Sequence, residues 1–394
     1  MRCKFLILSI ITNYFLVSQN IPSFVDVSKN YIYFGNDSNQ FYKFKSKLNE
    51  FIKGKRKRIS IVHFGGSHVQ GGFWSESIMN NLQQKANTKG GGYFVFPFQQ
   101  VKTNTPYYFK TYSNIKWKVN KCTKVTDTLK PIGMCGISAI TDTSCYIAVK
   151  NKWSALQGFH RIKFFHRFNS DYEIIPKFQI SSIRHSDFYT EYILQEMQDS
   201  ILFEIIKKPN TFSEFILDGI SCENDDVGVY YAGFGVNGAS SESFFKCALL
   251  LHQLKNVQVD LFILSFGVND VKNKAFNKDE FKQHYDTLIK MLQYVHPDAS
   301  ILITTISDNY IKRKGFNKRT EQGNEVIWKL ANIHPVAVWD LNGVMGGYKS
   351  MYKWYKAGLS ARDRIHFNKK GYILLGELMT QAFFQPIKIK KIIK

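Results

Sequence analysis

Residues 228–384 alternate between short apolar runs and amphipathic segments, and this alternation is what most limits the folds open to the chain. The run from Val259 to Phe266 is continuously apolar, as in strands buried on both faces of a parallel sheet. The segment after it carries apolar residues at helical spacing: Phe281, Tyr285, Leu288, Leu292 and Val295. Strands alternating with helices predict a doubly wound α/β fold with a mostly parallel sheet.

The alternation starts at residue 59, is interrupted, and resumes near residue 228. The predicted strands are Ile59–Phe64, Gly228–Gly235, Val259–Phe266, Ile301–Ile306 and Val336–Leu341. The predicted helices are Phe73–Lys85, Ser240–Leu254, Phe281–Val295, Thr320–Ile333 and Lys369–Phe384. Residues 101–225 instead consist of short β-rich runs separated by turns, which predicts an all-β sandwich. We therefore expect a discontinuous α/β domain, residues 20–100 and 226–394, with an inserted β-rich domain at 101–225.

The N-terminus has the composition of a secretory signal peptide. Arg2 and Lys4 precede an apolar stretch from Phe5 to about Val17, which is too short to span a bilayer comfortably. We expect residues 1–19 to be a signal peptide and the protein to be exported to the periplasm or outside a bacterial cell; an uncleaved N-terminal anchor stays open. Residues 20–58 are polar and aromatic, and we interpret their basic end, Lys53 to Arg58, as a solvated approach to the first core strand.

The net charge of +22 would suit an anionic partner, but the lysines are spread along the whole chain. Because no DNA- or RNA-binding signature is present, we predict no nucleic-acid partner. No pair of cysteines or histidines has metal-ligand spacing, so we predict no metal and no cofactor. In an exported protein one disulfide among Cys122, Cys135 and Cys145 is open, without a choice of pairing.

Polar residues follow three of the predicted strands, and a fourth polar block precedes the closing helix. The first strand leads into Gly65-Gly66-Ser67-His68, the second into Asn237-Gly238, the third into Asn269-Asp270, and Asp363 to His366 precede the closing helix. Taken alone, the first of these is either a tight turn with Ser67 capping a helix, or a turn that exposes Ser67 as a nucleophile. Because the carboxyl ends of parallel strands meet in one crevice, we expect these residues to lie together.

Together the residues supply the parts of a serine acyl-transfer site. Ser67 would be the nucleophile, His366 the base that takes its proton, and Asp363 the residue that orients the imidazole. The three-residue spacing of Asp363 and His366 is nearly one helical turn, which permits the contact. The amide of Ser67, the amide of Gly238 and the side-chain NH₂ of Asn269 are candidate donors to an oxyanion, with Gly238 allowing close approach.

These four blocks, in the same order, resemble those of the SGNH hydrolases, also called the GDSL esterase/lipase family. The resemblance covers roughly residues 59–100 and 228–385 and implies a flavodoxin-like three-layer fold, the triad named above and oxyanion donors at Gly238 and Asn269. One departure stands out: Gly66 occupies the position where the family usually has Asp. The β-rich insertion resembles the arrangement in the family's bacterial peptidoglycan O-acetylesterases.

The sequence therefore predicts a carboxylic ester hydrolase that removes O-acetyl or other small acyl groups from a carbohydrate such as peptidoglycan. Two alternatives stay open. The same triad could transfer the acyl group to a sugar hydroxyl, which would make the protein an O-acetyltransferase. The scaffold could also have lost activity and serve as a glycan-binding protein. The oligomeric state is not predicted.

Overall fold

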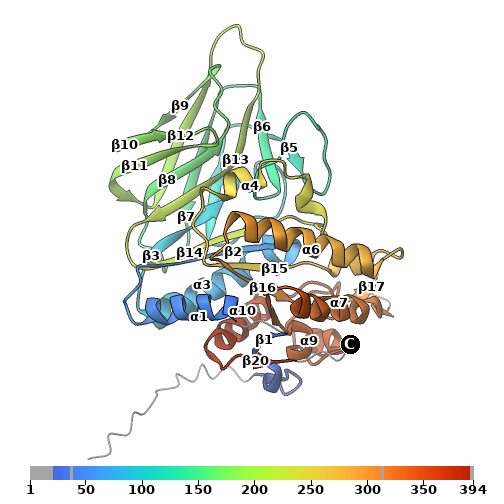
Figure 1. Cartoon of the computed structure of the whole chain (residues 1–394). Helices are drawn as coiled ribbons and strands as arrows, with labels where there is room; N and C mark the ends of the chain where they lie inside the picture. The colour runs from blue at the N-terminus through green and yellow to red at the C-terminus, as the bar shows by residue number, and fades with distance from the viewer. Residues whose placement is uncertain (1–20, 36–38, 312–314, 391–394) are drawn as a thin grey trace, which may run out of the picture.

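The computed structural model of the chain describes residues 21–35, 39–311 and 315–390, so the predicted signal peptide lies outside the described residues. Its centre is a set of parallel strands in the spatial order β3, β14, β2, β15, β16 and β19 (Figure 1). Their bounds are Gly90–Val95, Gly228–Gly235, Arg58–Gly65, Leu261–Ser265, Ser300–Thr304 and Ala337–Trp339. Two short strands extend this sheet beyond β19: β1 (Ile32–Phe34), which is antiparallel, and β20 (Lys388–Ile389).

Helices cover both faces of the parallel strands. Figure 1 shows α1 (Asn39–Ile52), α3 (Phe73–Ala86) and α10 (Lys369–Phe384) on one side, and α4 (Leu250–Leu254) and α6 (Lys278–Val295) on the other. Helix α7 (Arg319–Ile333) packs against α6 and β19. The remaining helices are short: η1 (Val27–Lys29), α2 (Ser67–Gln70), η2 (Ser243–Lys246), α5 (Val268–Lys272), α8 (Leu341–Val344) and α9 (Ser350–Lys356). The chain thus has the mixed α/β fold, with a parallel centre, that the sequence predicts.

Residues 101–225 are all described, and they form ten strands without a helix. Those strands are β4 (Phe109–Tyr112), β5 (Lys118–Lys121), β6 (Ile137–Thr141), β7 (Cys145–Asn151), β8 (Phe159–His166), β9 (Tyr172–Pro176), β10 (Ile180–His185), β11 (Tyr189–Gln198), β12 (Ser200–Lys207) and β13 (Phe215–Asn224). Four of them, in the order β4, β7, β12, β9, make a second sheet. Its Phe203 ring lies 4.8 Å from Phe164 of β8 and 5.2 Å from Tyr192 of β11, so the two sheets face each other.

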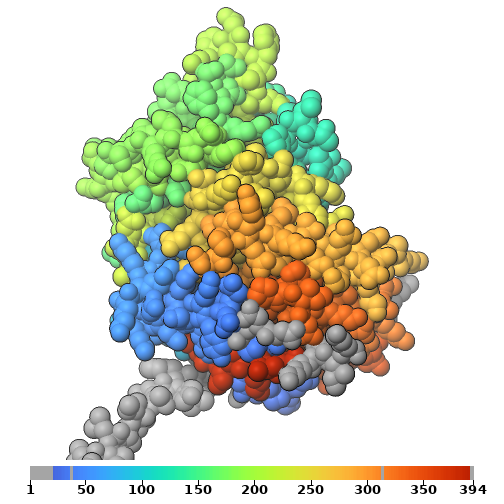
Figure 2. All heavy atoms as spheres, viewed as in Figure 1, coloured from blue at the N-terminus to red at the C-terminus, as the bar shows by residue number. Residues whose placement is uncertain are grey.

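Only one of the two sheets of the insertion is separate from the rest of the molecule, and the other is part of the larger sheet. Strand β13 pairs with β8 along one edge, and along the other edge with β6 near its start and with β3 of the parallel centre near its end. The larger sheet therefore runs continuously through both parts and has 14 strands in the described residues. In the space-filling view the green residues of the insertion rest directly against the blue and yellow parts of the molecule (Figure 2). A division into two domains at residues 101 and 225 stays a proposal.

The structure of the segment before the first core strand is more ordered than the solvated approach that we expected. Residues 39–52 form helix α1, which buries Phe41, Phe44, Leu48 and Phe51 at spacings of three, four and three. The basic run after α1 is also not simply solvated. Arg56 forms an ion pair with the buried Asp260, and Arg58 with Glu223. Buried carboxylates therefore fix two of the basic side chains that we expected in water.

The predicted helix Ser240–Leu254 is wrong as a continuous element. The structure has two short pieces, η2 and α4, separated by Cys247 to Leu249. The amide of Leu249 donates to the carbonyl of Ile132, in the insertion, at 3.2 Å. A contact distant in sequence therefore replaces the helical hydrogen bond there, and local helix propensity cannot show this.

Two further expectations concern the membrane and the cysteines. In the described ranges no helix combines the length and the hydropathy needed to cross a bilayer. Cys122, Cys135 and Cys145, for which one disulfide was open, are buried free thiols, as are Cys222 and Cys247.

Candidate active site

Ser67 lies where the chain turns from the central strand β2 into the short helix α2. Gly66 is the N-cap residue of α2 and makes no side-chain capping hydrogen bond, while Ser67 is the first residue of the helix. The Ser67 hydroxyl instead lies 2.7 Å from Nε2 of His366. The capping interpretation of Ser67 is therefore wrong, because this hydroxyl is used in a contact 299 residues away along the chain.

Asp363 holds the other side of the His366 ring. His366 Nδ1 lies 2.7 Å from Asp363 Oδ2, and Asp363 Oδ1 accepts hydrogen bonds from the amides of Ile365 and His366 at 2.9 and 3.0 Å. Burial alone would raise the pKa of Asp363, but these hydrogen bonds outweigh it and hold the pKa well below its ordinary value. An ionised Asp363 favours the tautomer with the proton on Nδ1, which leaves Nε2 free to accept the Ser67 proton.

The Asp363–His366 contact does not arise from a helical turn, as the spacing suggested. Residues 361–368 form an irregular turn that precedes α10, and Arg364 within it has a left-handed backbone with φ of 56°. The Arg364 guanidinium lies 4.9 to 5.6 Å from the ring centroids of three tyrosines, Tyr310, Tyr352 and Tyr355. The amide of Tyr310 donates to the Arg364 carbonyl at 3.0 Å. This cage fixes the turn that presents both residues to Ser67.

The two remaining predicted residues, Gly238 and Asn269, come shortly after β14 and β15, the strands on either side of β2. Gly238 follows β14 with φ of 85°, and a Cβ built there would meet nothing within 4 Å. The left-handed backbone thus favours glycine here, and the close approach of an oxyanion to the Gly238 amide stays a prediction. Asn269 lies in α5, after β15, and its Nδ2 donates to the carbonyl of Ala239 at 2.9 Å. That nitrogen also lies 3.2 Å from where a Cβ on Gly66 would stand.

The sheet order explains how these blocks meet. Strand β2 lies between β14 and β15, so the chain crosses to the other side of β2 when it passes from β14 to β15. Ligands of open α/β sheets bind at the carboxyl ends of strands where the order switches in this way. The five predicted residues follow or face this switch point, which is why residues up to 299 positions apart come together.

Gln70 ties the insertion to this site and was not singled out by the sequence. Its Oε1 accepts the amide of Asn237 at 2.6 Å, and its Nε2 donates to Thr103 Oγ1 and to the carbonyl of Asn104 at 2.9 and 2.7 Å. One buried glutamine thereby joins helix α2, the Gly238 loop and the start of the insertion. Its only sequence signal is an amide side chain three residues after Ser67.

His68 packs against the candidate base. Its ring centroid lies 5.1 Å from that of His366, and its Nδ1 is 2.9 Å from the hydroxyl of Tyr372. Burial, and then the neighbouring His366 ring, lower the pKa of His68 to about 3. His68 is therefore neutral near pH 7.

Asp270 accepts hydrogen bonds from the amide and the hydroxyl of Ser241 at 3.1 and 2.6 Å. Asp270 thereby connects helix α5 to the loop that follows Gly238.

Residues 205–374 match the model of the GDSL-like Lipase/Acylhydrolase family. The matched range contains Gly238, Asn269, Asp363 and His366, each in the block where the resemblance placed it. The chain carries an SGNH (GDSL-like) hydrolase domain. It is accordingly a carboxylic ester hydrolase, the enzyme class that the sequence predicts. Ser67 lies outside the matched range, so its place in the site rests on the geometry given above.

One solved structure shares the fold over most of the chain. A peptidoglycan O-acetylesterase is 21% identical, with a TM-score of 0.71, over 89% of this chain and 97% of that one. The covered 89% cannot be reached without part of residues 101–225, so the shared fold includes part of the insertion. A lipase/acylhydrolase from Enterococcus faecalis (21% identity, TM-score 0.31) and an acetyl xylan esterase (22%, 0.33) each align with 39% of this chain, and with 75% and 81% of their own. None of the curated proteins matches the sequence.

Proposed function

We propose that the protein is an exported serine esterase that removes O-acetyl or other small acyl groups from a carbohydrate such as peptidoglycan. The observation that carries the proposal is the unbroken hydrogen-bond chain from Ser67 through His366 to Asp363, with 2.7 Å at both steps. A serine hydroxyl is a weak nucleophile at neutral pH, and this arrangement supplies the base that it needs.

The reaction would proceed in two steps. Ser67 Oγ attacks the ester carbonyl carbon while its proton passes to His366 Nε2, and the proton then goes to the departing sugar hydroxyl as the ester bond breaks. A water molecule, deprotonated by His366, attacks the acyl-enzyme and releases the carboxylic acid and free Ser67. The amides of Ser67 and Gly238 and the Asn269 side chain would hold the oxyanion. Asn269 Nδ2 donates one of its two hydrogens to Ala239, which leaves the second for this task.

A carbohydrate substrate is supported by exposed side chains near the predicted nucleophile. Tyr107, from the insertion, is 55% exposed, and its ring lies 5.6 Å from that of Phe73, at the start of α3. Lys369, three residues after His366, places its Nζ 4.3 Å from the Tyr107 ring centroid. Aromatic faces beside a cation suit a sugar ring that carries hydroxyl or carboxylate groups. The fold shared with a peptidoglycan O-acetylesterase supports the same substrate class.

The deciding experiment is labelling with a fluorophosphonate probe, followed by peptide mapping of the modified residue. We expect the label on Ser67. We also expect Ser67→Ala to lower kcat for p-nitrophenyl acetate by about four orders of magnitude or more, as in other serine hydrolases. The control is Ser170→Ala, at an exposed serine of the insertion, which should keep full activity. A label elsewhere, or a fully active Ser67→Ala protein, would overturn the mechanism. Acetyl transfer to a glycan in place of acetate release would instead identify a transferase.

A further inference from the structure

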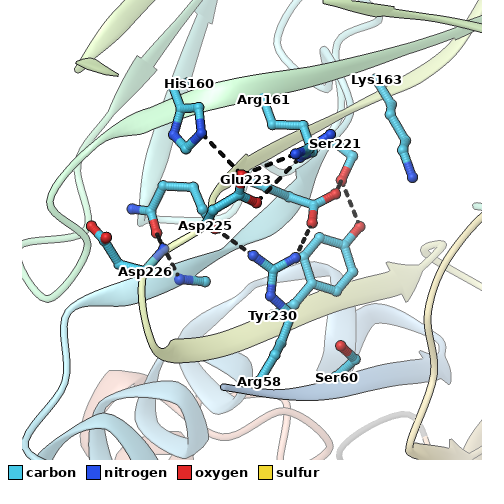
Figure 3. Close-up of polar contacts among 12 residues, drawn as sticks. Arg58, Ser60, His160, Arg161, Lys163, Ser221, Glu223, Asp225, Asp226 and Tyr230 are labelled. Carbon is cyan, nitrogen blue, oxygen red and sulfur yellow. Dashed lines mark hydrogen bonds and ion pairs between the residues drawn. The ribbon is translucent and has the colours of Figure 1, made fainter. Parts of the chain in front are cut away.

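A polar hollow lies at the end of β2 opposite to Ser67. Its volume is about 210 Å³, and it is lined by residues of β2, β14 and the insertion strands β8, β11 and β13, with Asn256 to Gln258 on the remaining side. Figure 3 shows the side chains of this cluster gathered over one face of the sheet. Ser60 lies five residues before the end of β2, which puts it roughly 15 to 20 Å from the turn at Ser67. The hollow is therefore separate from the candidate active site.

The walls of the hollow are fixed by paired charges. The Arg58 guanidinium binds the carboxylate of Glu223 and the carbonyl of Asn224. Ser221 Oγ lies 2.8 Å from Glu223 Oε1 and 2.9 Å from the Tyr230 hydroxyl. These dashed contacts in Figure 3 span strands β2, β14 and β13. The carboxylate of Glu223 is thus already occupied by donors from the protein.

The other carboxylate in the lining, Glu191, is paired with Arg161. Arg161 places Nη2 2.9 Å from Asp225 Oδ2 and Nη1 3.3 Å from Glu191 Oε1. In the strand register Arg161 lies opposite Glu223, and Lys163 opposite Ser221, so all four residues belong to neighbouring positions of β8 and β13. The acidic groups of the hollow therefore hold its arginines in place rather than facing empty space.

Two hydrogen-bond donors remain without enough partners. The Ser60 hydroxyl is fully buried and has no hydrogen-bond partner among the described residues, and Figure 3 shows it directed toward Tyr230. The Lys163 ammonium, which has three donor hydrogens, makes one hydrogen bond, to the Asn256 carbonyl at 3.1 Å. Its nearest carboxylate oxygen, on Glu191, is 4.0 Å away. A buried hydroxyl without a partner is costly, so a polar guest that supplies acceptors would relieve it.

We propose that this hollow binds a small organic carboxylate no larger than a single sugar ring. Arg58 and Arg161 are already paired with Glu223, Asp225 and Glu191, whereas the Lys163 ammonium makes one hydrogen bond and lies 4.0 Å from its nearest carboxylate oxygen, so Lys163 is the cation with capacity left for an anion. The unused groups are donors, which carboxylate oxygens satisfy. The volume lies below the range of about 300 to 1,000 Å³ that is usual for drug-sized ligands, which limits the guest to one ring or less. Acetate and a sugar acid such as glucuronate share this chemistry.

Calorimetric titration of the whole protein tests the proposal. The Ser67→Ala protein is titrated with sodium glucuronate, sodium acetate and glucose, the last being a sugar of similar size without a carboxylate. We expect saturable one-to-one binding of a carboxylate and no binding of glucose at the same concentrations. Lys163→Met should weaken carboxylate binding by about tenfold or more, the effect of one charged hydrogen bond. Lys150→Met, at an exposed lysine of β7, is the matched control and should leave binding unchanged.

The possible outcomes distinguish a sugar acid from a simple carboxylate as the ligand, and they show when the proposal fails. Binding of glucuronate alone identifies a sugar-acid site, and equal binding of acetate shows that the carboxylate alone is recognised; both support the proposal. It is overturned if neither carboxylate binds, if glucose binds as tightly as glucuronate, or if Lys163→Met binds like the parent protein. Ser60→Ala, which removes one buried oxygen, provides a second variant should Lys163→Met not fold.

Discussion

Gly66 stands where three loops of the candidate site come closest. A Cβ at this position would lie 3.2 Å from Asn269 Nδ2 and 3.3 Å from the carbonyl of Ala239. The departure from the usual Gly-Asp-Ser therefore has a local reason, since a larger residue would have to displace the Asn269 amide.

Gly66→Ala should lower activity more than stability. The added methyl group pushes against Asn269 Nδ2, the proposed oxyanion donor. Complete loss of one such donor costs about 2.7 to 4 kcal/mol, and a shift of a few tenths of an ångström should cost part of that, about tenfold in kcat. Steady-state hydrolysis of p-nitrophenyl acetate and the thermal midpoint measure the two effects.

Gly71→Ala is the matched control for this variant. Gly71 lies at the end of the same short helix with φ of −63°, and a Cβ there would come no closer than 3.8 Å to another atom outside its chain neighbours. Its replacement should leave kcat unchanged. Equal losses in the two variants would show that the helix, and not Asn269, responds to the extra methyl group.

His63 should make the stability of the protein depend on pH. The ring is fully buried between the Tyr231 hydroxyl and Ser265 Oγ, each at 2.7 Å, and burial lowers its pKa to about 3. Between about pH 3 and pH 6.5 the unfolded chain binds a proton at His63 and the folded chain does not, so stability falls as the pH is lowered. His63→Gln removes this contribution. Its free energy of unfolding should change less with pH, by at most about 1.4 kcal/mol per pH unit.

Urea unfolding of the wild type and the variant at several pH values in this window provides the measurement. His185→Gln, at an exposed position of β10, serves as the control and should keep the wild-type dependence on pH. Parallel pH profiles for wild type and His63→Gln would contradict the assignment of a buried neutral His63.

The residues that could be predicted from the sequence are those whose chemistry is tied to a strand end. Ser67, Gly238 and Asn269 follow three predicted strands, and the sheet brings the loops that carry them together. Gln70 could not be found in this way, because its role depends on partners at Thr103 and Asn237 that only the folded chain places beside it.

The turn from Ala361 to Asn368 carries both partners of Ser67, and Arg364 holds this turn in place. A left-handed backbone at a residue other than glycine is uncommon, and it persists where surrounding contacts fix it. Here those contacts are the three tyrosine rings and the hydrogen bond from the Tyr310 amide. Arg364 is thus a positioning residue in our proposed mechanism, without contact to the reacting atoms.

Arg364→Met should lower kcat by about tenfold while KM stays within about twofold, because a loosened His366 affects the transition state more than substrate binding. Arg364→Lys, which keeps the cation among the rings, should recover part of the loss. Arg362→Met, at the exposed neighbouring arginine, is the control and should be fully active. An equal rise of KM in both arginine variants, with kcat unchanged, would point to a general effect of charge on substrate binding.

Among the helices and strands, those with a clear period could be predicted to within a few residues. Strand β14 and helix α10 have the predicted bounds, and α6 begins three residues earlier than expected. Helix α1 was not predicted, although its buried apolar residues have helical spacing, because lysines and other polar residues between them make the segment polar on average. The break between η2 and α4 depends on Ile132, more than one hundred residues away, and no local pattern reveals it.

The molecule as a whole is tied together through β13. All ten residues of this strand are buried, and it pairs with the parallel centre on one edge and with the insertion on the other. Gln70 and the Arg58–Glu223 ion pair add two further links between the parts. A pattern of short β-rich runs can predict an insertion, but it does not show which of the inserted strands pairs with the parallel sheet.

We therefore expect the insertion and the α/β part to unfold in one transition. Calorimetry should give a single endotherm whose van't Hoff and calorimetric enthalpies agree, with far-ultraviolet circular dichroism and tryptophan fluorescence changing together. Replacement of residues 101–225 by a short glycine-serine linker should prevent folding, because β3 would lose its β13 partner and expose Tyr93 and Val95, which are fully buried in the native protein. Two separate endotherms, or a folded and soluble deletion variant, would instead establish the insertion as an independent domain.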